Sequence, residues 1–422
     1  MSENFKIYIG LDDTDHVEIG CTTEKFNQFL SYLKKNIEFE LVSRRLVRLW
    51  PFASRRTRGN AALSAVLVLD KNDENKLYDL CNRWFEELLS EISKYPLCTH
   101  PASPALIISK TQFHKEIYWE TVQGHVKLSS RLKEIKNYNC KIYSSSSQWG
   151  IIGASAALAW APELNSSYEL IPWRKKSMIG KKRLLNLETV IELDNKYPDT
   201  FLNRDPTKNR GLIAPRTPCP VLYGIRSNSP EILEESHKWL QSKKGVEKSN
   251  DYAIHCTNQL SDDHVTPSYG TVLCKPSTSK GAHSSIRVFV NGKTCILLAF
   301  SQGGSVNRLL RSLEPGDIVL WTGLFSPNDS SIHLEKLSIL DPVPRIYNRP
   351  TCCGNSMKSA GISQKLRCNK CGKNCEKYWL GKIPLFSNII MINNWTEPNP
   401  SNRRHLSKPL NLGVPVLNNL IP

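Results

Sequence analysis

Residues 5–23 read FKIYIGLDDTDHVEIGCTT, and they predict a strand, an acidic turn and a helix in that order. Every second residue from Phe5 to Leu11 is apolar, which is typical of a strand that buries one face. Thr22 then opens a stretch in which apolar residues recur at helical spacing, namely Phe26, Phe29, Leu30 and Leu33. The acidic turn is therefore expected where the strand ends and the helix begins.

The same mixture of strands and helices continues along the next part of the chain. Residues 62–69 are rich in apolar and β-favouring side chains and predict a strand, whereas residues 75–95 and 150–160 predict helices. Ser229 and Pro230 form a cap residue and a first-turn proline, which predict a helix to about Gln241. This order of elements predicts a multidomain α/β or α+β protein.

The pattern changes between residues 268 and 340. Short β-rich segments are separated there by Gly, Pro, Ser and Asn, and they lie at residues 269–273, 286–290, 295–300, 318–320 and 333–340. Short strands at even spacing predict a small β-barrel, with the OB-fold as the leading candidate. The polar stretch 243–263 before them is predicted to be a linker.

The charge of the chain is concentrated near its C-terminal end. The 422 residues predict two to four domains at about 150 residues per domain. Lys and Arg number 56 against 39 Asp and Glu, a net charge of +17, and residues 341–422 hold twelve of the basic and three of the acidic residues. A net charge of +9 in this segment predicts binding to a polyanion, nucleic acid in particular. A solubilising tail is the alternative.

The sequence predicts a cytoplasmic protein without a membrane partner. Its first residues, MSENFK, lack the apolar core of a signal peptide. The longest nearly uncharged apolar run, residues 151–162, is shorter than the roughly 20 residues of a membrane helix. Eight of the thirteen cysteines are scattered singly, which is typical of a reducing compartment.

Asp12, Asp13 and Asp15 form the first candidate site. Carboxylates this close repel one another unless a cation neutralises them, and oxygen ligands of this kind suit Mg²⁺ that also binds phosphate. The helix start after them offers free N–H groups to an anion, and the hydroxyls of Thr22 and Thr23 either cap the helix or receive phosphate. The alternative is an acidic turn with a threonine cap. The chain has no G-x-x-x-x-G-K-[ST] loop, so an ATP site here is of another type.

Arginine-rich runs at residues 44–51 and 55–60 form the second candidate site. Arginine binds phosphate with two parallel hydrogen bonds, and Gly59 lets the backbone approach a ligand closely. A solvated basic loop is the alternative.

Five cysteines near the C-terminal end indicate a metal site. Cys368 and Cys371 form a C-x-x-C knuckle, the spacing of a zinc ribbon in which four thiolates hold Zn²⁺. The usual first knuckle is altered, because Cys352 directly precedes Cys353. The fourth ligand is either Cys352 or Cys375, and free thiols are the alternative to a metal.

Together these segments resemble the TiaS family of tRNA(Ile)-agmatinylcytidine (agmatidine) synthetases. The resemblance starts with residues 9–15 and 20–23 and covers nearly the whole chain. Its further motifs, in family order, are LVRL (46–49), TRGN (57–60), IGA (152–154), AALAW (156–160), YPDTF (197–201), TPCPVLYGIR (217–226), GTV (270–272), MKSAG (357–361) and RRHL (403–406).

The resemblance implies a domain order and a reaction. It implies a kinase-like α/β domain over residues 1–124, a ferredoxin-like domain over 125–262, an OB-fold over 263–344, a zinc ribbon over 345–380 and a basic segment over 381–422. Such enzymes use ATP and Mg²⁺ to phosphorylate the carbon-2 oxygen of the wobble cytidine in CAU-anticodon tRNA(Ile). Agmatine then displaces the phosphate, and the product pairs with A in the codon AUA.

The resemblance also implies roles for individual residues. The implied catalytic residues are Asp12, Asp13, Asp15 and Thr22, and those for ATP and phosphate are Gly20, Cys21, Thr23, Arg58, Gly59 and Asn60. An agmatine pocket is implied at Gly153, Ala154, Thr217 and Tyr223. The tRNA-binding residues are Arg403, Arg404 and His405, and the structural Zn²⁺ ligands are Cys352, Cys353, Cys368 and Cys371.

Two other functions suit the same residues. One is a ligase of the same fold that uses another amine or another tRNA, and the other is a nucleic-acid-binding protein with an OB-fold and a zinc ribbon but no activity. The presence of Asp12, Asp13, Asp15 and Thr22 favours an enzyme. We also expect a chain ending near Lys243 to keep the nucleotide site, because these residues precede that point.

Overall fold

The chain divides into two compact units in the computed structural model. The model describes residues 4–16, 19–56, 59–163, 166–343, 350–359, 361, 364–375 and 394–416. The first unit comprises the chain up to Thr266 together with Asn399–Gly413, and the second comprises Pro267–Pro398 and the residues from Val414 onward. The segment Asn399–Gly413 thus returns to the first unit after the chain has completed most of the second.

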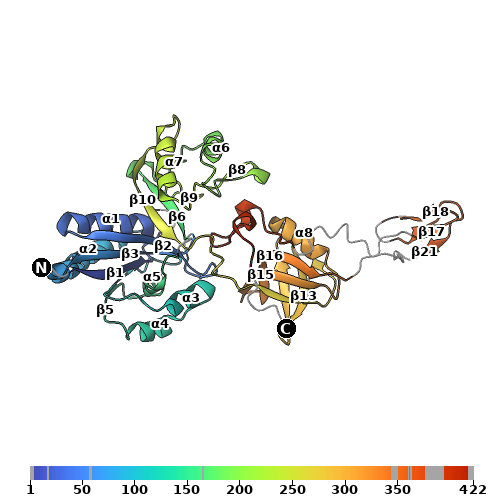
Figure 1. Ribbon diagram of the computed structural model, residues 1–422, viewed down its shortest axis with the longest axis horizontal. Coiled ribbons are helices and arrows are strands. Elements are labelled where there is room, and N and C mark those ends of the chain that lie inside the picture. The colour runs from blue at the N-terminus through green and yellow to red at the C-terminus, as the bar shows by residue number, and fades with distance from the viewer. Residues whose placement is uncertain are drawn as a thin grey trace. The chain divides into compact units, whose positions relative to one another are not determined.

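An eight-stranded sheet forms the centre of the first unit (Figure 1). Its strand order is β5-β4-β1-β3-β2-β10-β6-β9, and every neighbouring pair is antiparallel except β2 and β10. The strands are β1 (Asn4–Asp12), β2 (Glu40–Arg48), β3 (Ala61–Asp70), β4 (Ala105–Ser109), β5 (Cys140–Ser144), β6 (Ser167–Arg174), β9 (Ile225–Ser227) and β10 (Ser249–Thr257). The strands predicted at residues 5–11 and 62–69 are confirmed as β1 and β3.

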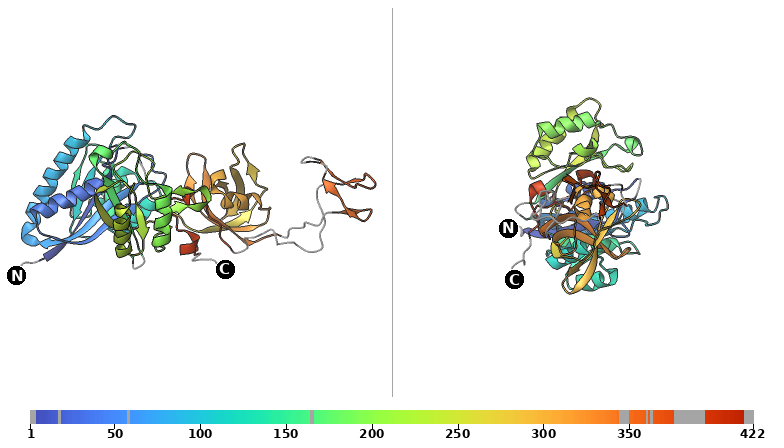
Figure 2. Two further views of the ribbon diagram at one scale, coloured as in Figure 1. Left: turned by 90° about the horizontal axis from the view of Figure 1, so that it is seen from above. Right: turned by 90° about the vertical axis from the view of Figure 1, so that its right-hand side faces the viewer.

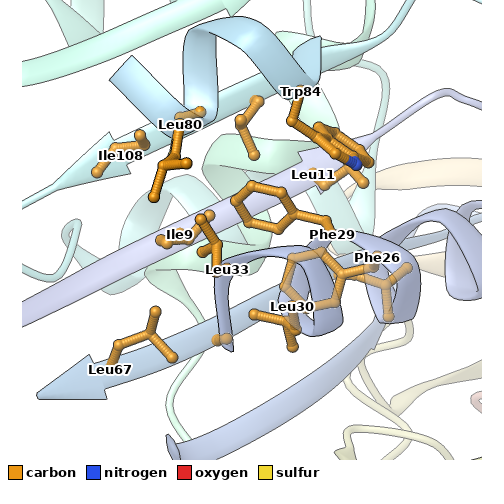
Figure 3. Close-up of a cluster of buried hydrophobic side chains, with 14 of the residues drawn as sticks. Ile9, Leu11, Phe26, Phe29, Leu30, Leu33, Leu67, Leu80, Trp84 and Ile108 are labelled. Atoms are coloured by element: carbon orange, nitrogen blue, oxygen red, sulfur yellow. The ribbon is translucent and has the colours of Figure 1, made fainter. Parts of the chain in front are cut away.

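Helices α1 (Thr22–Asn36) and α2 (Glu74–Ile92) cover one face of this sheet. Figure 3 shows their core, in which Ile9 and Leu11 of β1 meet Phe29 of α1 and Trp84 of α2. The ring centroids of Phe29 and Trp84 lie 4.7 Å apart. The helix predicted to start at Thr22 is confirmed, and because β1 ends in this core its last residue, Asp12, is firmly positioned.

Helix α5 (Gly150–Ala159) covers the opposite face, with α3 (Lys115–Gln123) and α4 (Leu128–Ile135) beside it (Figure 1). The small residues predicted to form a helix here let α5 lie directly on β1. A Cβ placed on Gly10 would lie 2.5 Å from the carbonyl oxygen of Ala154. Glycine at position 10 is therefore a packing requirement of the interface between α5 and β1.

Strand β10 corrects the prediction of a linker over residues 243–263. This strand lies inside the sheet between β2 and β6. Its sequence looks polar, but some of its hydrophilic side chains have partners on neighbouring elements. Asp251, for example, accepts a hydrogen bond from Asn27 Nδ2 at 2.7 Å. Ala253 and Cys256 meanwhile enter the cores on the two faces.

A smaller layer packs near the edge of the sheet formed by β6 and β9. It contains α6 (Leu187–Lys196), α7 (Pro230–Ser242) and the short pair β7 (Arg204–Asp205) and β8 (Arg210–Gly211). The predicted start of α7 is confirmed, because Ser229 Oγ accepts a hydrogen bond from the backbone N–H of Ile232 at 3.2 Å and Pro230 is the first helical residue.

The second unit contains a closed five-stranded barrel (Figures 1 and 2). Its strands are β11 (Ser268–Val272), β13 (Ser284–Val290), β14 (Lys293–Ala299), β15 (Ile318–Ser326) and β16 (Ser331–Asp341), and the pairing of β11 with β13 closes it. Helix α8 (Ser305–Arg311) joins β14 to β15, and β12 (Ser277–Thr278) pairs with the start of β13. The predicted barrel of short strands is confirmed.

Very short strands follow the barrel. They are β17 (Thr351–Cys352), β18 (Asn355–Ser356), β19 (Lys358–Ser359), β20 (Leu366–Arg367) and β21 (Asn374–Cys375). In the part of the chain that the model describes, no helix combines the length and apolar character needed to cross a membrane.

We predict that Gly10→Ala lowers the free energy of unfolding of the first unit by ~1–3 kcal/mol, because the added methyl group meets main-chain atoms of α5. Gly211→Ala is the matched control, since its Cβ would lie 3.6 Å from the nearest atom, an ordinary contact. Chemical unfolding of both variants measures the difference. Equal stability of the two variants would contradict the packing argument.

Candidate active site

A cavity of about 450 Å³ opens at the carboxyl end of β1. Its wall combines the acidic turn after β1, the end of β2, the start of α5, the irregular segment 212–221 and His405. The predicted acidic and basic sites therefore face the same space, although they are separate in the sequence.

Asp15 holds Thr22 at the start of α1. Asp15 Oδ1 accepts hydrogen bonds from the backbone N–H of Thr22 at 2.5 Å and from Thr22 Oγ1 at 2.8 Å. The N-cap residue, Cys21, makes no side-chain cap, so Asp15 supplies the carboxylate that satisfies the first turn. The Thr22 hydroxyl is thereby directed at a potential proton acceptor.

Asp12 is enclosed by α5. A Cβ on Gly153 would overlap the carboxylate of Asp12, so only glycine lets the helix approach this acid. Burial raises the pKa of Asp12 well above its usual range, and the charges of Asp13 and Asp15 raise it further. A cation in the cavity would favour the ionised form of Asp12.

Asp13 is held in an unusual conformation. Its φ of 56° lies in the left-handed region, and its carbonyl oxygen accepts a hydrogen bond from the backbone N–H of Ser103 at 3.0 Å. Burial raises the pKa of Asp13 to about 7, although the guanidinium of Arg55, 3.8 Å from the carboxylate, opposes the shift. Arg55 in turn lies 5.5 Å from the ring centroid of Trp149.

Two arginines and a buried glutamate form the basic part of the cavity. Arg48 and Arg226 each lie 3.0 Å from one carboxylate oxygen of Glu169. Burial by itself would raise the pKa of Glu169, but the charges of Arg226 and Arg48 outweigh it and lower the pKa to about 2. Glu169 thus fixes both guanidinium groups while neutralising only one of their two charges.

His405 reaches this basic group from the C-terminal segment. A Cβ on Gly59 would overlap Arg48 Nη1 and lie 3.1 Å from the imidazole, so the glycine leaves room for both side chains. The positive charge of Arg48 lowers the pKa of His405, although the side chain itself is exposed. The imidazole is therefore neutral near pH 7 and can both donate and accept a hydrogen bond.

The segment that carries His405 is fastened to the first unit by main-chain bonds. The carbonyl oxygens of His405 and Leu406 accept from the backbone N–H groups of Leu260 and Asp262 at 3.1 and 2.9 Å. Leu406 is fully buried in the core beneath α5. A chain ending near Lys243 would lack both β10 and His405, so the sheet and the cavity wall would be incomplete in it.

The cavity includes most of the predicted site residues. Those that line it are Asp12, Asp13, Asp15, Cys21, Thr22, Thr23, Gly59, Asn60, Gly153, Thr217 and His405. Gly20 instead supports the acidic turn, where a Cβ would lie 2.8 Å from the backbone nitrogen of His16. Arg58 lies outside the described residues.

Four other predicted residues do not line the cavity. Ala154 is fully buried against β1, and Tyr223 is fully buried with its hydroxyl 2.9 Å from His237 Nδ1. Arg404 lies with its guanidinium carbon 4.5 Å from the ring centroid of Phe52, and Arg403 is partly exposed beside it.

Sequence reasoning missed Glu169, Arg226 and Trp149, which also line the cavity. One signal was available for Glu169, since a single acid in an otherwise apolar strand predicts a buried ion pair. Arg226 ends the motif of residues 217–226, but its ion pair had no local signal, because only the pairing of β6 with β9 brings it to Glu169.

Four thiols converge in the second unit. The ligand atoms of Cys352, Cys353, Cys368 and Cys371 all lie within 4.8 Å of one another, the only group of three or more metal-ligating side chains to do so among the described residues. Cys375 lies apart, with its sulfur 3.5 Å from Met357 Sδ. Backbone N–H groups of Cys371 and Lys370 lower the pKa of Cys368 to about 6, which favours a thiolate.

Two family models match the first unit, the TiaS TCKD domain over residues 8–147 and the TiaS FLD domain over residues 148–264. The tRNA 2-agmatinylcytidine synthetase TiaS of Methanosarcina mazei is 30% identical over 431 residues, covering 95% of this chain and 96% of the relative. The protein of the same name from Methanocaldococcus jannaschii is 28% identical over 433 residues, covering 96% and 98%.

A solved structure leads to the same assignment. The crystal structure of TiaS in complex with an isoleucine tRNA and ATP is similar, with a TM-score of 0.78, 26% identity and coverage of 96% of this chain and 97% of that one. Since the similarity extends over both units and the predicted motifs, the chain belongs to the TiaS family.

Proposed function

We infer that this chain uses ATP to attach agmatine to the wobble cytidine of CAU-anticodon tRNA(Ile), giving 2-agmatinylcytidine. Membership of the TiaS family supports the reaction. The observation in the chain itself that carries the inference is the Thr22 hydroxyl, hydrogen-bonded to Asp15 in a cavity that also contains Asp12 and Asp13. A non-catalytic relative would have no need to keep buried, mutually repelling carboxylates in a cavity.

The proposed chemistry has two steps. The carbon-2 oxygen of the cytidine first takes the γ-phosphoryl group of ATP, which turns a poor leaving group into a good one. The primary amine of agmatine then attacks carbon 2, the carbon–oxygen bond breaks, and phosphate leaves with that oxygen. Arg48 and Arg226 suit the phosphoryl group, because one positive charge remains after Glu169 is neutralised. Asp15 would accept the proton of Thr22 if the threonine carries phosphate during the transfer.

The acidic turn fits a magnesium ion. Asp15 is engaged with Thr22, which leaves Asp12 and Asp13 as the carboxylates to hold it. A cation would offset the burial and the mutual repulsion that raise their pKa values. When bound, Mg²⁺ would neutralise charge on the phosphates of ATP. The further ATP contacts that we propose are Cys21, Thr23, Arg58, Gly59 and Asn60, whereas Gly20 would act by shaping the acidic turn.

We propose the finer domain assignments on the same basis. The kinase-like domain over 1–124, the ferredoxin-like domain over 125–262 and the OB-fold over 263–344 are proposed from the resemblance. The two family models, which meet between residues 147 and 148, support two successive domains in this part of the chain, and the closed barrel supports the third. The zinc ribbon over 345–380 is supported by the four converging thiols, which match the ligand number and type of structural Zn²⁺. The basic segment over 381–422, with Arg403 and Arg404, is proposed to bind tRNA phosphates.

The deciding experiment is mass spectrometry of the wobble nucleoside after incubating the chain with ATP, Mg²⁺, agmatine and CAU-anticodon tRNA(Ile). We expect a mass gain equal to agmatine minus water.

Asp12→Asn should lower the rate by about two orders of magnitude or more, because it weakens the cation site. Asp79→Asn, on the exposed side of α2, is the control. An unmodified nucleoside with the wild-type chain would refute the proposed function.

The zinc proposal predicts about one Zn²⁺ per chain by elemental analysis. Cys371→Ser should lose the metal and lower the melting temperature of the second unit, because a four-thiolate site cannot close with three sulfurs. Cys375→Ser should keep it, because this sulfur lies outside the cluster. Loss of zinc from the Cys375 variant alone would overturn the ligand assignment.

The position of His405 predicts that it acts within the cavity. His405→Ala should lower turnover at least about tenfold while changing tRNA affinity less than about twofold, because the side chain lines the cavity. Asn411→Ala, exposed on the same segment, is the control. Steady-state kinetics and filter binding measure the two effects. A loss of tRNA affinity with unchanged turnover would instead assign His405 to the tRNA-binding surface.

A further inference from the structure

Arg183 has an unusual set of partners. Its Nε donates to the carbonyl oxygen of Val221 at 3.0 Å, and Nη2 donates to the same oxygen at 2.8 Å and to that of Cys219 at 2.9 Å. Nη1 donates to the carbonyl oxygens of Pro215 and Thr217 at 2.9 and 2.8 Å. One guanidinium group therefore binds four main-chain carbonyls within seven consecutive residues.

The segment from Pro215 to Val221 needs these donors. It has no regular secondary structure, and three of its residues, Pro215, Pro218 and Pro220, have no N–H group. Carbonyl oxygens that no local N–H group can satisfy must find partners elsewhere. Within the described residues, no carboxylate forms an ion pair with Arg183, so main-chain oxygens are its principal acceptors.

The same segment is a wall of the cavity. Pro215, Arg216, Thr217, Cys219 and Val221 all line it. The Oγ1 atom of Thr217 is buried without a hydrogen-bond partner, so this wall carries a polar atom whose hydrogen-bonding capacity is unused.

We propose that Arg183 is a positioning residue for the amine substrate: it shapes the Pro215–Val221 wall and so places the Thr217 hydroxyl for contact with agmatine. The proposal rests on the proposed function and assigns to Arg183 an effect on amine binding without contact to the reacting atoms. The acidic turn, which lines the same cavity, would attract the cationic amine, and the wall would limit its position.

Arginine suits this role better than lysine. Its planar fork carries five N–H donors in a fixed arrangement, whereas an ammonium group has three on a flexible stem.

The wall also makes hydrogen bonds that do not involve Arg183. Pro220 accepts a hydrogen bond from the backbone N–H of Arg174 at 2.8 Å, and Leu222 N–H donates to Pro172 at 2.8 Å. Removing the side chain should therefore loosen the wall without unfolding the unit.

The test compares Arg183→Ala, Arg183→Lys and Thr217→Val with the wild-type chain. We expect KM for agmatine to rise at least about tenfold in all three variants, while KM for ATP changes less than about twofold. Millimolar guanidinium chloride should partly restore the agmatine KM of Arg183→Ala, because the ion can occupy the vacated carbonyl cluster. The same salt should act on the wild-type chain only as an inhibitor.

Arg204→Ala is the matched control, since Arg204 is partly exposed, pairs with Asp194 at 2.8 Å and does not line the cavity. A merely structural role of Arg183 would lower the melting temperature and raise KM for ATP and agmatine together, without rescue by guanidinium, and would overturn the proposal. If Arg183→Ala does not fold, Arg183→Lys and Thr217→Val decide. Unchanged agmatine KM in those two variants would also overturn it.

Equilibrium binding of agmatine to the full chain separates this proposal from the proposed function. A wild-type chain that binds agmatine in an Arg183-dependent way but does not modify tRNA would support the inference and refute the ligase activity. A wild-type chain that modifies tRNA while Arg183→Ala and Thr217→Val bind agmatine normally would refute the inference alone.

Discussion

Every carboxylate in the cavity must be compensated, and this requirement organises the first unit. Asp15 is compensated by the first turn of α1, Glu169 by two arginines and, in part, Asp13 by Arg55. Breaking a buried pair by removing one partner typically costs about 3–5 kcal/mol, so these arrangements constrain the elements that carry them. Asp12 has no comparable partner among these groups, which is the physical reason for expecting a cation there.

Close approach of backbone segments is the second constraint on the site. Gly153 admits the Asp12 carboxylate to the surface of α5, and Gly59 leaves room for the guanidinium of Arg48 with the imidazole of His405 beside it. Gly10 brings α5 onto β1 in the first place. In each case a Cβ would displace a charged or main-chain group, so the size of the cavity depends on residues that contribute no chemistry of their own.

The cavity is completed by segments that lie far apart in the sequence. Asn399–Gly413 belongs to the first unit although the barrel and the cysteine cluster precede it in the sequence. Its buried Leu406 and its main-chain bonds hold His405 in place. The geometry of the site therefore depends on a segment that follows the whole barrel, and the catalytic unit cannot be defined by a single cut in the sequence.

The sequence by itself determined the local parts of this protein. The alternation of residues 5–11, the helix start at Thr22, the short barrel strands and the C-x-x-C knuckle depend on neighbouring residues, so their patterns are visible in a single sequence. The motifs of residues 9–15 and 217–226 also indicated the family.

Tertiary structure alone decided the rest. Strand β10 looked like a linker because its polar side chains find partners far away in the chain, and Arg226, His405 and Arg183 acquire their roles only through strand pairing and long-range carbonyl contacts. Such contacts join residues tens to hundreds of positions apart. No local sequence pattern indicates them, because these residues meet only when the whole chain has folded.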